Sequence, residues 1–438
     1  MKYYVEPTFE SYTDKMVRLY NNEIVSDTNV LTITFQVTED CCMACTYCYQ
    51  NNKSKNKMDF NVAKKVIDNL LKSDDYYNTH NIKFLIIDFI GGEPFMEVEL
   101  MDKIMDYFIK SCIENNHRFL HRFKISIASN GLLYFDKAVQ DFIKKYKDFL
   151  SLTISIDGNK ELHDACRVDL SGNGTYDRAI AAAMHLRENY IPDLETKMTL
   201  SPDNISYIFE AVKNMISIGY MSIALNCVYE EGWEISHAKI MYNELKRVAD
   251  WLFENDAFRK YRISLFNTSY FYPIPEEETK NWCGGVCNGM LSFDYKGRAF
   301  PCIRYMESSL NNKRNPFSIG DINGLFVTEE DKEKYNFLSS ITRQSQSTDE
   351  CINCPIAKGC AWCSAYNYEQ FGTPNKRATY ICIMHKARSL ANAYYYNKGY
   401  YLMGEKERFS INLPKEEALK IIDEQEWELL KYYEGVRE

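Results

Sequence analysis

The sequence predicts an α/β protein: a partial (β/α)6 barrel of the TIM type, followed by a cysteine-rich, mostly irregular domain. Strand-like and helix-like stretches alternate through the first two hundred or so residues, which is typical of parallel βαβ units. Most of the 15 cysteines fall into three clusters, at 41–48, 283–302 and 351–382. A doubly wound parallel sheet is the second choice of fold for the first part.

The elements of this first part follow from hydrophobic periodicity. Residues 82–90, IKFLIIDFI, form a near-continuous apolar run, as expected for a strand that is covered on both faces. The other expected strands are 31–37, 124–129, 152–156, 196–200 and 221–228. Between them, helical spacing predicts helices at 62–73, 101–115, 138–149, 176–189 and 208–219.

A chain of 438 residues can hold two or three domains. Residues 236–256 have the pattern of one amphipathic helix, PIPEEETKN at 273–281 resembles a linker, and helical periodicity returns near the C-terminus. We therefore divide the chain into an N-terminal extension (1–28), the barrel (29–235), a bridging helix and linker (236–280), a cysteine-rich domain (281–385) and a closing helical segment (386–438).

Charge and hydropathy exclude several classes of protein. The net charge of −9 argues against a broad nucleic-acid surface. No apolar run approaches the ~20 residues of a membrane span, and MKYYVEPTFESYTDK lacks the apolar segment of a secretory signal. We expect a cytoplasmic protein with no nucleic-acid or membrane partner. In a reducing compartment, clustered cysteines indicate metal or iron–sulfur ligation, whereas Cys112, Cys166 and Cys227 fit buried small hydrophobes.

Four site-like loops follow expected strands. GGEP (91–94), SNG (129–131) and SIDG (155–158) each end one strand, and the first cysteine cluster follows another. In parallel α/β folds, ligands lie at the carboxyl ends of the strands. The four loops are therefore expected to surround one site.

The stretch CCMACTYCYQ at 41–50 allows two spacings, because Cys41 and Cys42 are adjacent. Counting from Cys42, a bacterial ferredoxin run would require Cys and Pro at positions 52 and 53, where the chain has Asn and Lys. A structural zinc site would need a second C-x2-C pair of cysteines or nearby histidines. The other spacing, C-x3-C-x2-C, places three thiolates on one loop, within the ~3.5 Å per residue that backbone spans. Three thiolates leave one iron of a [4Fe–4S] cube with an open position.

This C-x3-C-x2-C motif, with Tyr47 before its last cysteine, resembles the signature of the radical S-adenosylmethionine (SAM) enzymes, and GGEP, SNG and SIDG resemble their SAM-contacting loops. The resemblance covers about 29–230. It implies that SAM chelates the open iron and is cleaved to a 5′-deoxyadenosyl radical, with Cys42 a bystander packed beneath the loop. The iron ligands would be Cys41, Cys45 and Cys48. Glycine permits close backbone approach and a carboxylate suits an ammonium group, so Gly91, Gly92 and Glu93 would hold the methionine end. The remaining SAM contacts would be Tyr47, Asn130, Ser155, Arg167 and Val228.

The later cysteines resemble the SPASM extension of radical SAM enzymes, although the family commonly has three residues where this chain has two, between Cys360 and Cys363. The resemblance implies two auxiliary [4Fe–4S] clusters, hence three in all. If Cys283 were not a ligand, the first auxiliary cluster would keep an open iron. Paired zinc knuckles are the alternative, but five residues separate them here, against ~15–20 in a four-cysteine zinc site. The implied ligands are Cys283, Cys287, Cys302 and Cys363 for the first cluster, and Cys351, Cys354, Cys360 and Cys382 for the second.

Two subgroups of SPASM enzymes compete. Anaerobic sulfatase-maturating enzymes, which make formylglycine, carry an aspartate base after the cysteine of a G-x4-C unit, and here that residue is Ile303. The blocks TFQVTEDC, DFIGGEPF, SIDGNKELHDACRV, NCVYEEGW, NWCGG and CIRYMESSL resemble more closely the peptide maturases that act on CXXX-repeat targets (ranthipeptide maturases). That resemblance implies thioether formation in a ribosomal precursor peptide. Carbon–carbon or carbon–oxygen crosslinks would use the same machinery. We assign no catalytic side chain.

The resemblance also implies partners: the precursor peptide and an external one-electron donor such as flavodoxin or ferredoxin. About thirty residues precede the first expected strand, too few for the winged-helix leader-binding domain of many peptide maturases. Leader recognition is therefore expected elsewhere on the chain or on a separate protein. A hypothesis from a different functional class is that the chain is a plain iron–sulfur electron carrier, which would not cleave SAM.

Overall fold

The computed structural model describes residues 29–435 except 193, 276–282, 284 and 286–288. It confirms a mixed α/β fold built on parallel strands. The six expected strands all form, with bounds shifted by at most a few residues. They are β1 (Val30–Gln36), β2 (Phe84–Ile90), β3 (Phe123–Ser129), β4 (Leu150–Ile154), β5 (Glu195–Leu200) and β6 (Ser222–Cys227).

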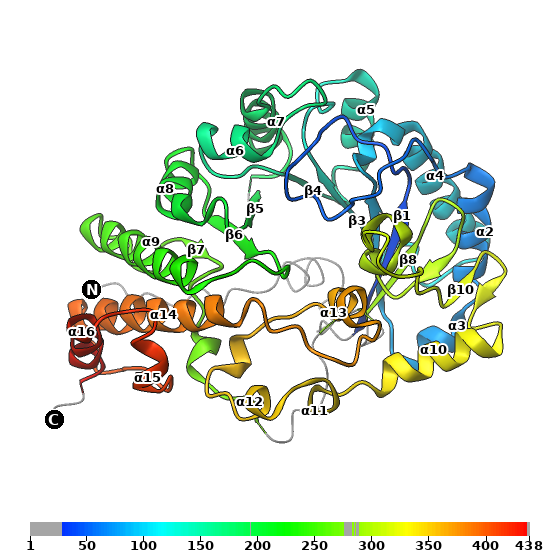
Figure 1. Ribbon diagram of the computed structural model, residues 1–438. Helices are drawn as coiled ribbons and strands as arrows, with labels where there is room; N and C mark the ends of the chain where they lie inside the picture. Colours follow the sequence, from blue (N-terminus) through cyan, green and yellow to red (C-terminus); the bar gives the residue numbers. More distant parts are fainter. Residues whose placement is uncertain (1–28, 193, 276–282, 284, 286–288, 436–438) are drawn as a thin grey trace.

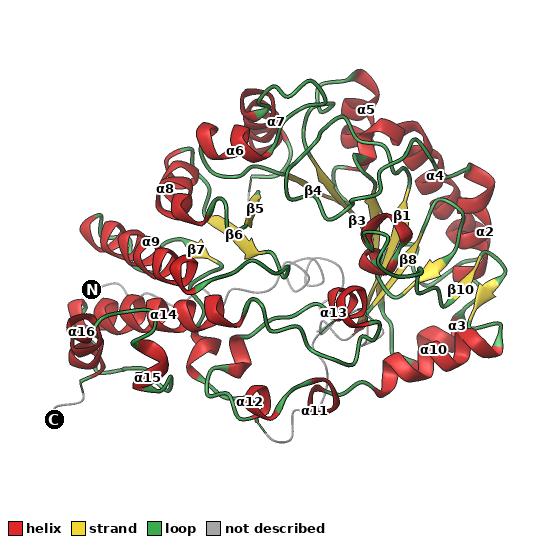
Figure 2. Cartoon of the chain, in the orientation of Figure 1, coloured by secondary structure: helices red, strands yellow, loops and turns green. Residues whose placement is uncertain are grey.

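The strands form an open barrel. β1 to β4 pair in sequence order, each parallel to the next, in one sheet. A second parallel sheet holds β5, β6 and the short β7 (Arg262–Ile263). The strands line the interior of an arc, and the helices lie outside it (Figure 2). Because every β1–β6 strand runs in the same direction, their carboxyl ends meet along one rim.

The helices between the strands cover the outer face (Figure 1). The first of these helices is α2 (Phe60–Leu70). Its N-cap residue Asp59 accepts a hydrogen bond from the backbone of Asn61. Two short helices, α3 (Asp74–Thr79) and α6 (Lys160–Cys166), were not expected from the periodicity, because a helix of one or two turns carries little pattern. The expected helices are α2 (Phe60–Leu70), α4 (Val98–Glu114), α5 (Lys137–Tyr146), α7 (Tyr176–Asn189), α8 (Ile208–Ser217) and α9 (Ile235–Glu254).

A strand from the cysteine-rich region extends the first sheet. β8 (Met290–Phe293) pairs in parallel with β1, with Met290 opposite Thr32. Three short antiparallel strands continue from it: β9 (Ala299–Phe300), β10 (Gly320–Asp321) and β11 (Gly324–Leu325). The barrel and the cysteine-rich region therefore share one hydrogen-bonded sheet. The domain boundaries given above stay a prediction.

The remaining helices close the molecule on the side of the cysteine-rich region. A long helix, α14 (Cys382–Leu402), packs along α9, where Tyr394 and Lys398 both contact Asp250 at 2.6 Å. α16 (Glu424–Glu434) packs on the same side, with α15 (Lys415–Ala418) near it (Figure 1). The others are α10 (Glu329–Ser340), α11 (Arg343–Gln346), α12 (Asp349–Ile352) and α13 (Ser364–Phe371).

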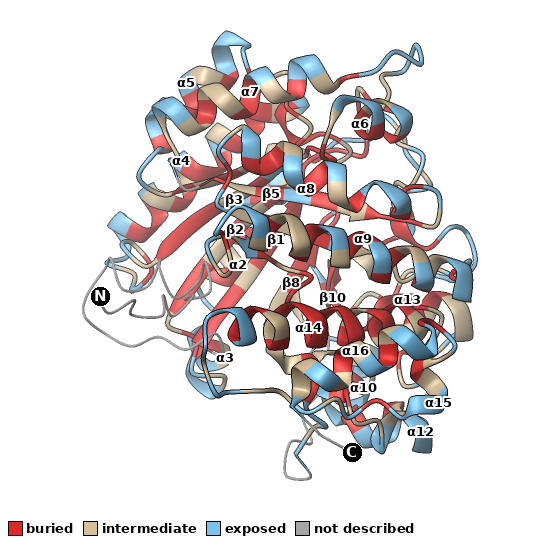
Figure 3. Cartoon of the chain, turned by 90° about the vertical axis from the view of Figure 1, so that its left-hand side faces the viewer, coloured by how far each residue is buried: buried red, intermediate tan, exposed pale blue. Residues whose placement is uncertain are grey.

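The strands are the most buried elements, and the helices keep exposed outer faces (Figure 3). β1 illustrates this, because Leu31, Ile33 and Phe35 are at most 1% exposed. Among the described residues, no helix is both long and apolar enough to cross a membrane.

Candidate active site

A cavity of about 570 Å³ opens at the carboxyl ends of the barrel strands. Its volume lies in the range of sites for small molecules and cofactors. It brings together every residue that the sequence assigned to the SAM site and its iron. Those lining residues are Cys41, Cys45, Tyr47, Cys48, Gly91, Gly92, Glu93, Asn130, Ser155, Arg167 and Val228.

Three of the four clustered cysteines face this cavity. Cys41, Cys45 and Cys48 line it, whereas Cys42 does not. The amide nitrogen of Asn130 lies 3.3 Å from the sulfur of Cys42, which is therefore held by the SNG loop. Among the described residues, no three His, Cys, Asp or Glu side chains converge as ligands of a single metal ion. A cubane takes each thiolate on a different iron, so three thiols spread along one wall suit its shape.

The two glycines of GGEP are required by the cysteine loop itself. A Cβ on Gly92 would lie 2.3 Å from the carbonyl oxygen of Asp40, and one on Gly91 would lie 2.8 Å from that of Thr38. The backbone nitrogens of Gly92 and Glu93 donate hydrogen bonds to these carbonyls. The glycines thus let two loops meet at backbone distance, which adds a packing reason to the ligand approach that the sequence suggested.

Glu93 connects three segments of the site. Its carboxylate accepts hydrogen bonds from the Ser129 hydroxyl and the Asn130 backbone at 2.8 Å each, and from the backbone of Phe95 at 3.1 Å. The side chain is buried, and burial raises the pKa of Glu93 to about 7, although the three donors act in the opposite direction. Two of the three hydrogen bonds that Glu93 accepts come from the SNG loop, so Glu93 holds that loop in place.

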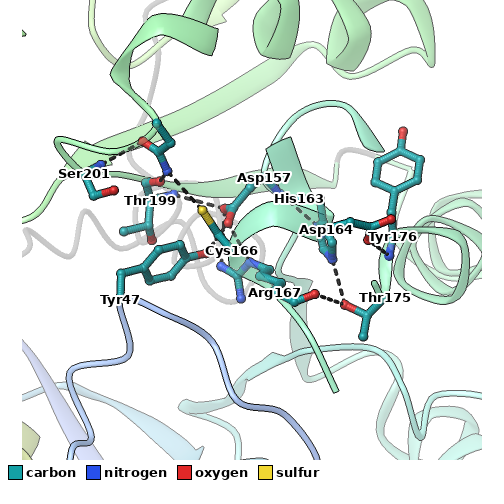
Figure 4. Close-up of polar contacts among 11 residues, drawn as sticks. Tyr47, Asp157, His163, Asp164, Cys166, Arg167, Thr175, Tyr176, Thr199 and Ser201 are labelled. Atoms are coloured by element: carbon teal, nitrogen blue, oxygen red, sulfur yellow. Dashed lines mark hydrogen bonds and ion pairs between the residues drawn. The ribbon is translucent and has the colours of Figure 1, made fainter. Parts of the chain in front are cut away.

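Arg167 lies against a carboxylate that sequence reasoning did not single out. The guanidinium Nε is 2.8 Å from Asp157 Oδ2 and its Nη2 is 3.3 Å from Oδ1 (Figure 4). The hydroxyl of Tyr47 donates to the same carboxylate, and the Arg167 guanidinium lies 5.3 Å from the centre of the Tyr47 ring. Asp157 is the third residue of SIDG, so the motif contained it. Nothing in the spacing showed which cation it would meet.

The barrel interior adds polar groups to the cavity. Asp88 on β2 and Lys197 on β5 both line it, and Thr34 donates a hydrogen bond of 3.1 Å to Asp88. Burial raises the pKa of Asp88, against the hydrogen bonds from Ser126 and Thr34. Cys227, which we expected to be a core cysteine, also lines the cavity. Strand alternation could have placed Asp88 on the inner face, but an apolar run hides such a position.

The cysteine-rich region also contributes to the lining of the cavity. Ile303 and Arg304, which directly follow Cys302, line it together with Glu230 after β6. Arg304 donates a hydrogen bond of 2.7 Å to Glu230, and its guanidinium lies 5.3 Å from the ring of Tyr49 in the cysteine loop. The cavity therefore includes residues of the first cysteine loop and residues that directly follow Cys302.

The four cysteines assigned to the second auxiliary cluster line a separate cavity of about 460 Å³. The guanidinium of Arg377 contacts the sulfur of Cys360 at 2.9 Å, and Lys386 also lines the cavity. Burial raises the pKa of the Cys360 thiol, and the Arg377 guanidinium opposes this increase, because a cation favours the anionic form that binds iron. The donor set and the room both fit a cluster held by Cys351, Cys354, Cys360 and Cys382.

Two of the cysteines assigned to the first auxiliary cluster, Cys283 and Cys302, lie near Gly285. A Cβ there would lie 3.4 Å from the sulfur of Cys302 and 3.8 Å from that of Cys283. Burial raises the pKa of Cys302, and the nearby Cys363 and Cys283 thiols raise it further. Three neighbouring thiols fit a cluster better than three unrelated core residues. Cys287 lies outside the described residues, so its place as the fourth ligand stays a prediction.

An open parallel barrel with three cysteines of one loop at its carboxyl rim defines a radical SAM domain. In agreement, a model of the radical SAM superfamily matches residues 35–215. The chain therefore carries a radical SAM domain, which implies a [4Fe–4S] cluster and SAM. An uncharacterized protein of Methanocaldococcus jannaschii is 32% identical over 213 residues, which cover 48% of this chain and 66% of that protein.

Other similarities extend into the cysteine-rich region. A cysteine-type anaerobic sulfatase-maturating enzyme of Clostridium perfringens is 23% identical over 337 residues, 73% of this chain and 85% of that enzyme. The structure of anSMEcpe with bound AdoMet and the Cp18Cys peptide has a TM-score of 0.61 at 18% identity, covering 85% of this chain and 99% of that one. Streptococcus suis SuiB bound to the precursor peptide SuiA has a TM-score of 0.53 at 16% identity, covering 81% and 76%. At these identities the structural likeness shows a shared fold.

Proposed function

We propose that this chain is a cytoplasmic radical SAM peptide maturase that closes thioether crosslinks in a ribosomally synthesised precursor peptide. It would hold three [4Fe–4S] clusters and receive electrons from a flavodoxin or ferredoxin. The single observation that carries the proposal is the cavity that Cys41, Cys45 and Cys48 share with Ile303 and Arg304. A peptide in this cavity would lie between the SAM site and the region of Cys302.

The chemistry of thioether closure sets what the cavity must do. Joining a cysteine sulfur to a carbon removes one hydrogen atom from the carbon, one proton from the thiol and one electron. Bound SAM and the clusters would supply hydrogen-atom abstraction and one-electron transfer. The chain's own residues must position the peptide and exclude water from a carbon radical. Ile303 offers an apolar surface next to Cys302, and the aromatic residues Tyr49 and Tyr229 line the same cavity.

A second candidate function is formylglycine formation on a sulfatase, and one observation favours it. Asp88 lines the cavity with a pKa raised by burial, and it forms no ion pair among the described residues. A carboxylate of this kind could accept a proton. Asp88 would then take the role of the aspartate that is absent at position 303. The sulfatase-maturating enzyme of Clostridium perfringens is also similar to this chain, and the similarity covers 73% of this chain.

The experiment compares products after anaerobic reconstitution with iron and sulfide. The enzyme is incubated with SAM, dithionite and either a short cysteine-rich peptide encoded beside its gene or a sulfatase-derived peptide containing cysteine. Thioether closure is expected to remove two hydrogen atoms from the first peptide and to consume its thiol. An aldehyde on the second peptide, trapped by a hydrazide probe, would support the second candidate instead. No 5′-deoxyadenosine with any peptide would contradict both and would leave the electron-carrier hypothesis.

The variant Asp88→Asn separates the two candidates further. If Asp88 is the base of formylglycine formation, the aldehyde yield should fall by about 10²-fold or more. Asp136 at the N-cap of α5 provides the control, because it is an aspartate outside the cavity. The Asp136→Asn variant is expected to retain the wild-type yield.

A further inference from the structure

We propose that Asp157 is the positioning residue of the SAM site: it fixes the guanidinium of Arg167 and the side chain of Tyr47, and through them the affinity for SAM. The resemblance assigned Arg167 and Tyr47 to SAM, and it left Asp157 without a role. The inference concerns the binding of SAM and does not depend on which peptide is modified.

The geometry leaves one edge of Arg167 available. Asp157 engages Nε at 2.8 Å and Nη2 at 3.3 Å, so that a two-point contact sets the plane of the guanidinium. Nη1 has no hydrogen-bond partner among the described residues, and Arg167 lines the cavity. Because Asp157 is fully buried and Arg167 is only 8% exposed, little water can compete for this pair. Asp157 thus holds the arginine in one orientation and leaves Nη1 for a ligand.

The same carboxylate reaches the cysteine loop. The hydroxyl of Tyr47 donates to Asp157 Oδ2, and Tyr47 lies between Cys45 and Cys48 in the chain. The backbone of Thr199, at the end of β5, donates to Oδ1 at 3.2 Å. Asp157 therefore joins three elements that are far apart in sequence: the cysteine loop, the helix end that carries Arg167, and the opposite sheet (Figure 4).

A second set of contacts holds Asp157 and Arg167 in place from behind. The ring of His163 accepts a hydrogen bond of 3.3 Å from the Asp157 backbone through Nδ1, which places the proton on Nε2. Nε2 then donates to the Thr175 hydroxyl at 3.0 Å, and that hydroxyl donates to the Arg167 carbonyl at 2.9 Å. Backbone and side chain of the pair are thus both fixed, as a preorganised binding site requires.

Energetics also favour a positioning role. A buried ion pair often adds no net stability over packed apolar residues, because desolvation offsets the attraction. Arg167 lies in the wall of the cavity, where the orientation of its guanidinium matters for a ligand. Removing one partner would leave the other buried and free to rotate, and hydrogen bonds to charged groups are among the stronger ones in proteins.

The test is a double-mutant cycle on the dissociation constant of SAM, measured by anaerobic calorimetry on reconstituted full-length protein with matched iron and sulfide content. Asp157→Asn and Arg167→Gln are each expected to weaken SAM binding by about tenfold or more. If Asp157 acts through Arg167 and Tyr47, the double variant should bind SAM more tightly than the product of the two single effects predicts, because both substitutions disturb Arg167. The electron paramagnetic resonance signal of the reduced cluster, with and without SAM, gives a second readout.

A matched control lies seven residues away. Asp164 accepts a hydrogen bond of 2.8 Å from the Tyr176 backbone and pairs with Lys160 at 3.0 Å, but it does not line the cavity. Asp164→Asn should keep wild-type SAM affinity. A merely structural Asp157 would lower the unfolding midpoint of its variants and leave the dissociation constant of the folded protein unchanged, which would overturn the proposal. Fully additive effects in the cycle would overturn it as well.

If Asp157→Asn does not fold, Asp157→Glu provides the test. It keeps the charge for Arg167 but moves the carboxylate by one methylene, so that both the guanidinium plane and Tyr47 must shift. Weakened SAM binding at an unchanged unfolding midpoint supports the proposal, and wild-type affinity overturns it.

Discussion

The carboxylate of Glu93 accepts a hydrogen bond of 2.8 Å from the hydroxyl of Ser129, and both side chains are buried. This contact joins the loops that follow β2 and β3, and the backbone of Asn130 donates to the second oxygen of Glu93. Two of the strand-end motifs are therefore one hydrogen-bonded unit. The site is held together by contacts between its loops as well as by any ligand.

Replacing Glu93 by alanine should leave the backbone donors of the partly buried Asn130 and the buried Phe95 without a partner. Each unsatisfied donor costs about 1–3 kcal/mol, so the free energy of unfolding should fall by a few kcal/mol. Urea denaturation measures it, with Glu97→Ala as the control, because the one side-chain contact of Glu97 within the described part of the chain is an exposed one with Lys57. An unchanged midpoint for Glu93→Ala would contradict the assignment.

The variant Gly92→Ala should disrupt the first cysteine loop. Its Cβ would lie 2.3 Å from the Asp40 carbonyl oxygen and 2.6 Å from Cys41 Cβ, so the loop must move. We expect the reconstituted protein to lose about four irons, the content of one cubane, together with SAM cleavage. Gly172→Asn is the control, because its surroundings are open and asparagine tolerates the positive φ there. Iron analysis that finds full loading of Gly92→Ala would refute this prediction.

The cysteines of the second cavity can be tested in the same way. Cys354→Ser should reduce the iron content by about four atoms per chain, because Cys354 lines the cavity with three other cysteines. Cys112 is fully buried in α4 and lines no such cavity, so Cys112→Ala should keep all of the iron. Equal iron content in the two variants would argue against a cluster at this position.

Stability should depend on pH through His163. Burial lowers the pKa of His163 to about 4 from 6.5, and the neighbouring Arg167 contributes to the decrease. The folded state therefore favours the neutral ring. Stability is full above pH 6.5 and is lost as the pH falls from 6.5 towards 4, by up to about 3 kcal/mol.

The measurement is denaturant unfolding of the cluster-free protein between pH 4 and 8, so that acid loss of iron does not contribute. The His163→Gln variant has no ionisable side chain at this position. The loss of unfolding free energy that His163 causes between pH 6.5 and 4 should therefore be absent from it. Identical slopes for the wild type and the variant below pH 6.5 would show that His163 is not responsible.

Much of the barrel could be predicted because its signals are local. The apolar run at 82–90 became β2 and the helical spacing at 176–189 became α7 with the same bounds, since periodicity reports which face of an element is buried. The short helix α6 was missed for the same reason, because seven residues give too little pattern. The pairing of β8 with β1 could not be predicted, because β8 has four residues and its partner lies some 260 positions away.

The sequence by itself determined the order of strands and helices, the loops that reach the carboxyl rim and the cysteines that share a spacing, because each depends on neighbouring residues. Only the tertiary structure decided that Asp157 meets both Arg167 and Tyr47 and that Ile303 enters the cavity. A buried polar group takes whichever partner the packing of distant segments brings within about 3 Å, and no local pattern encodes that choice.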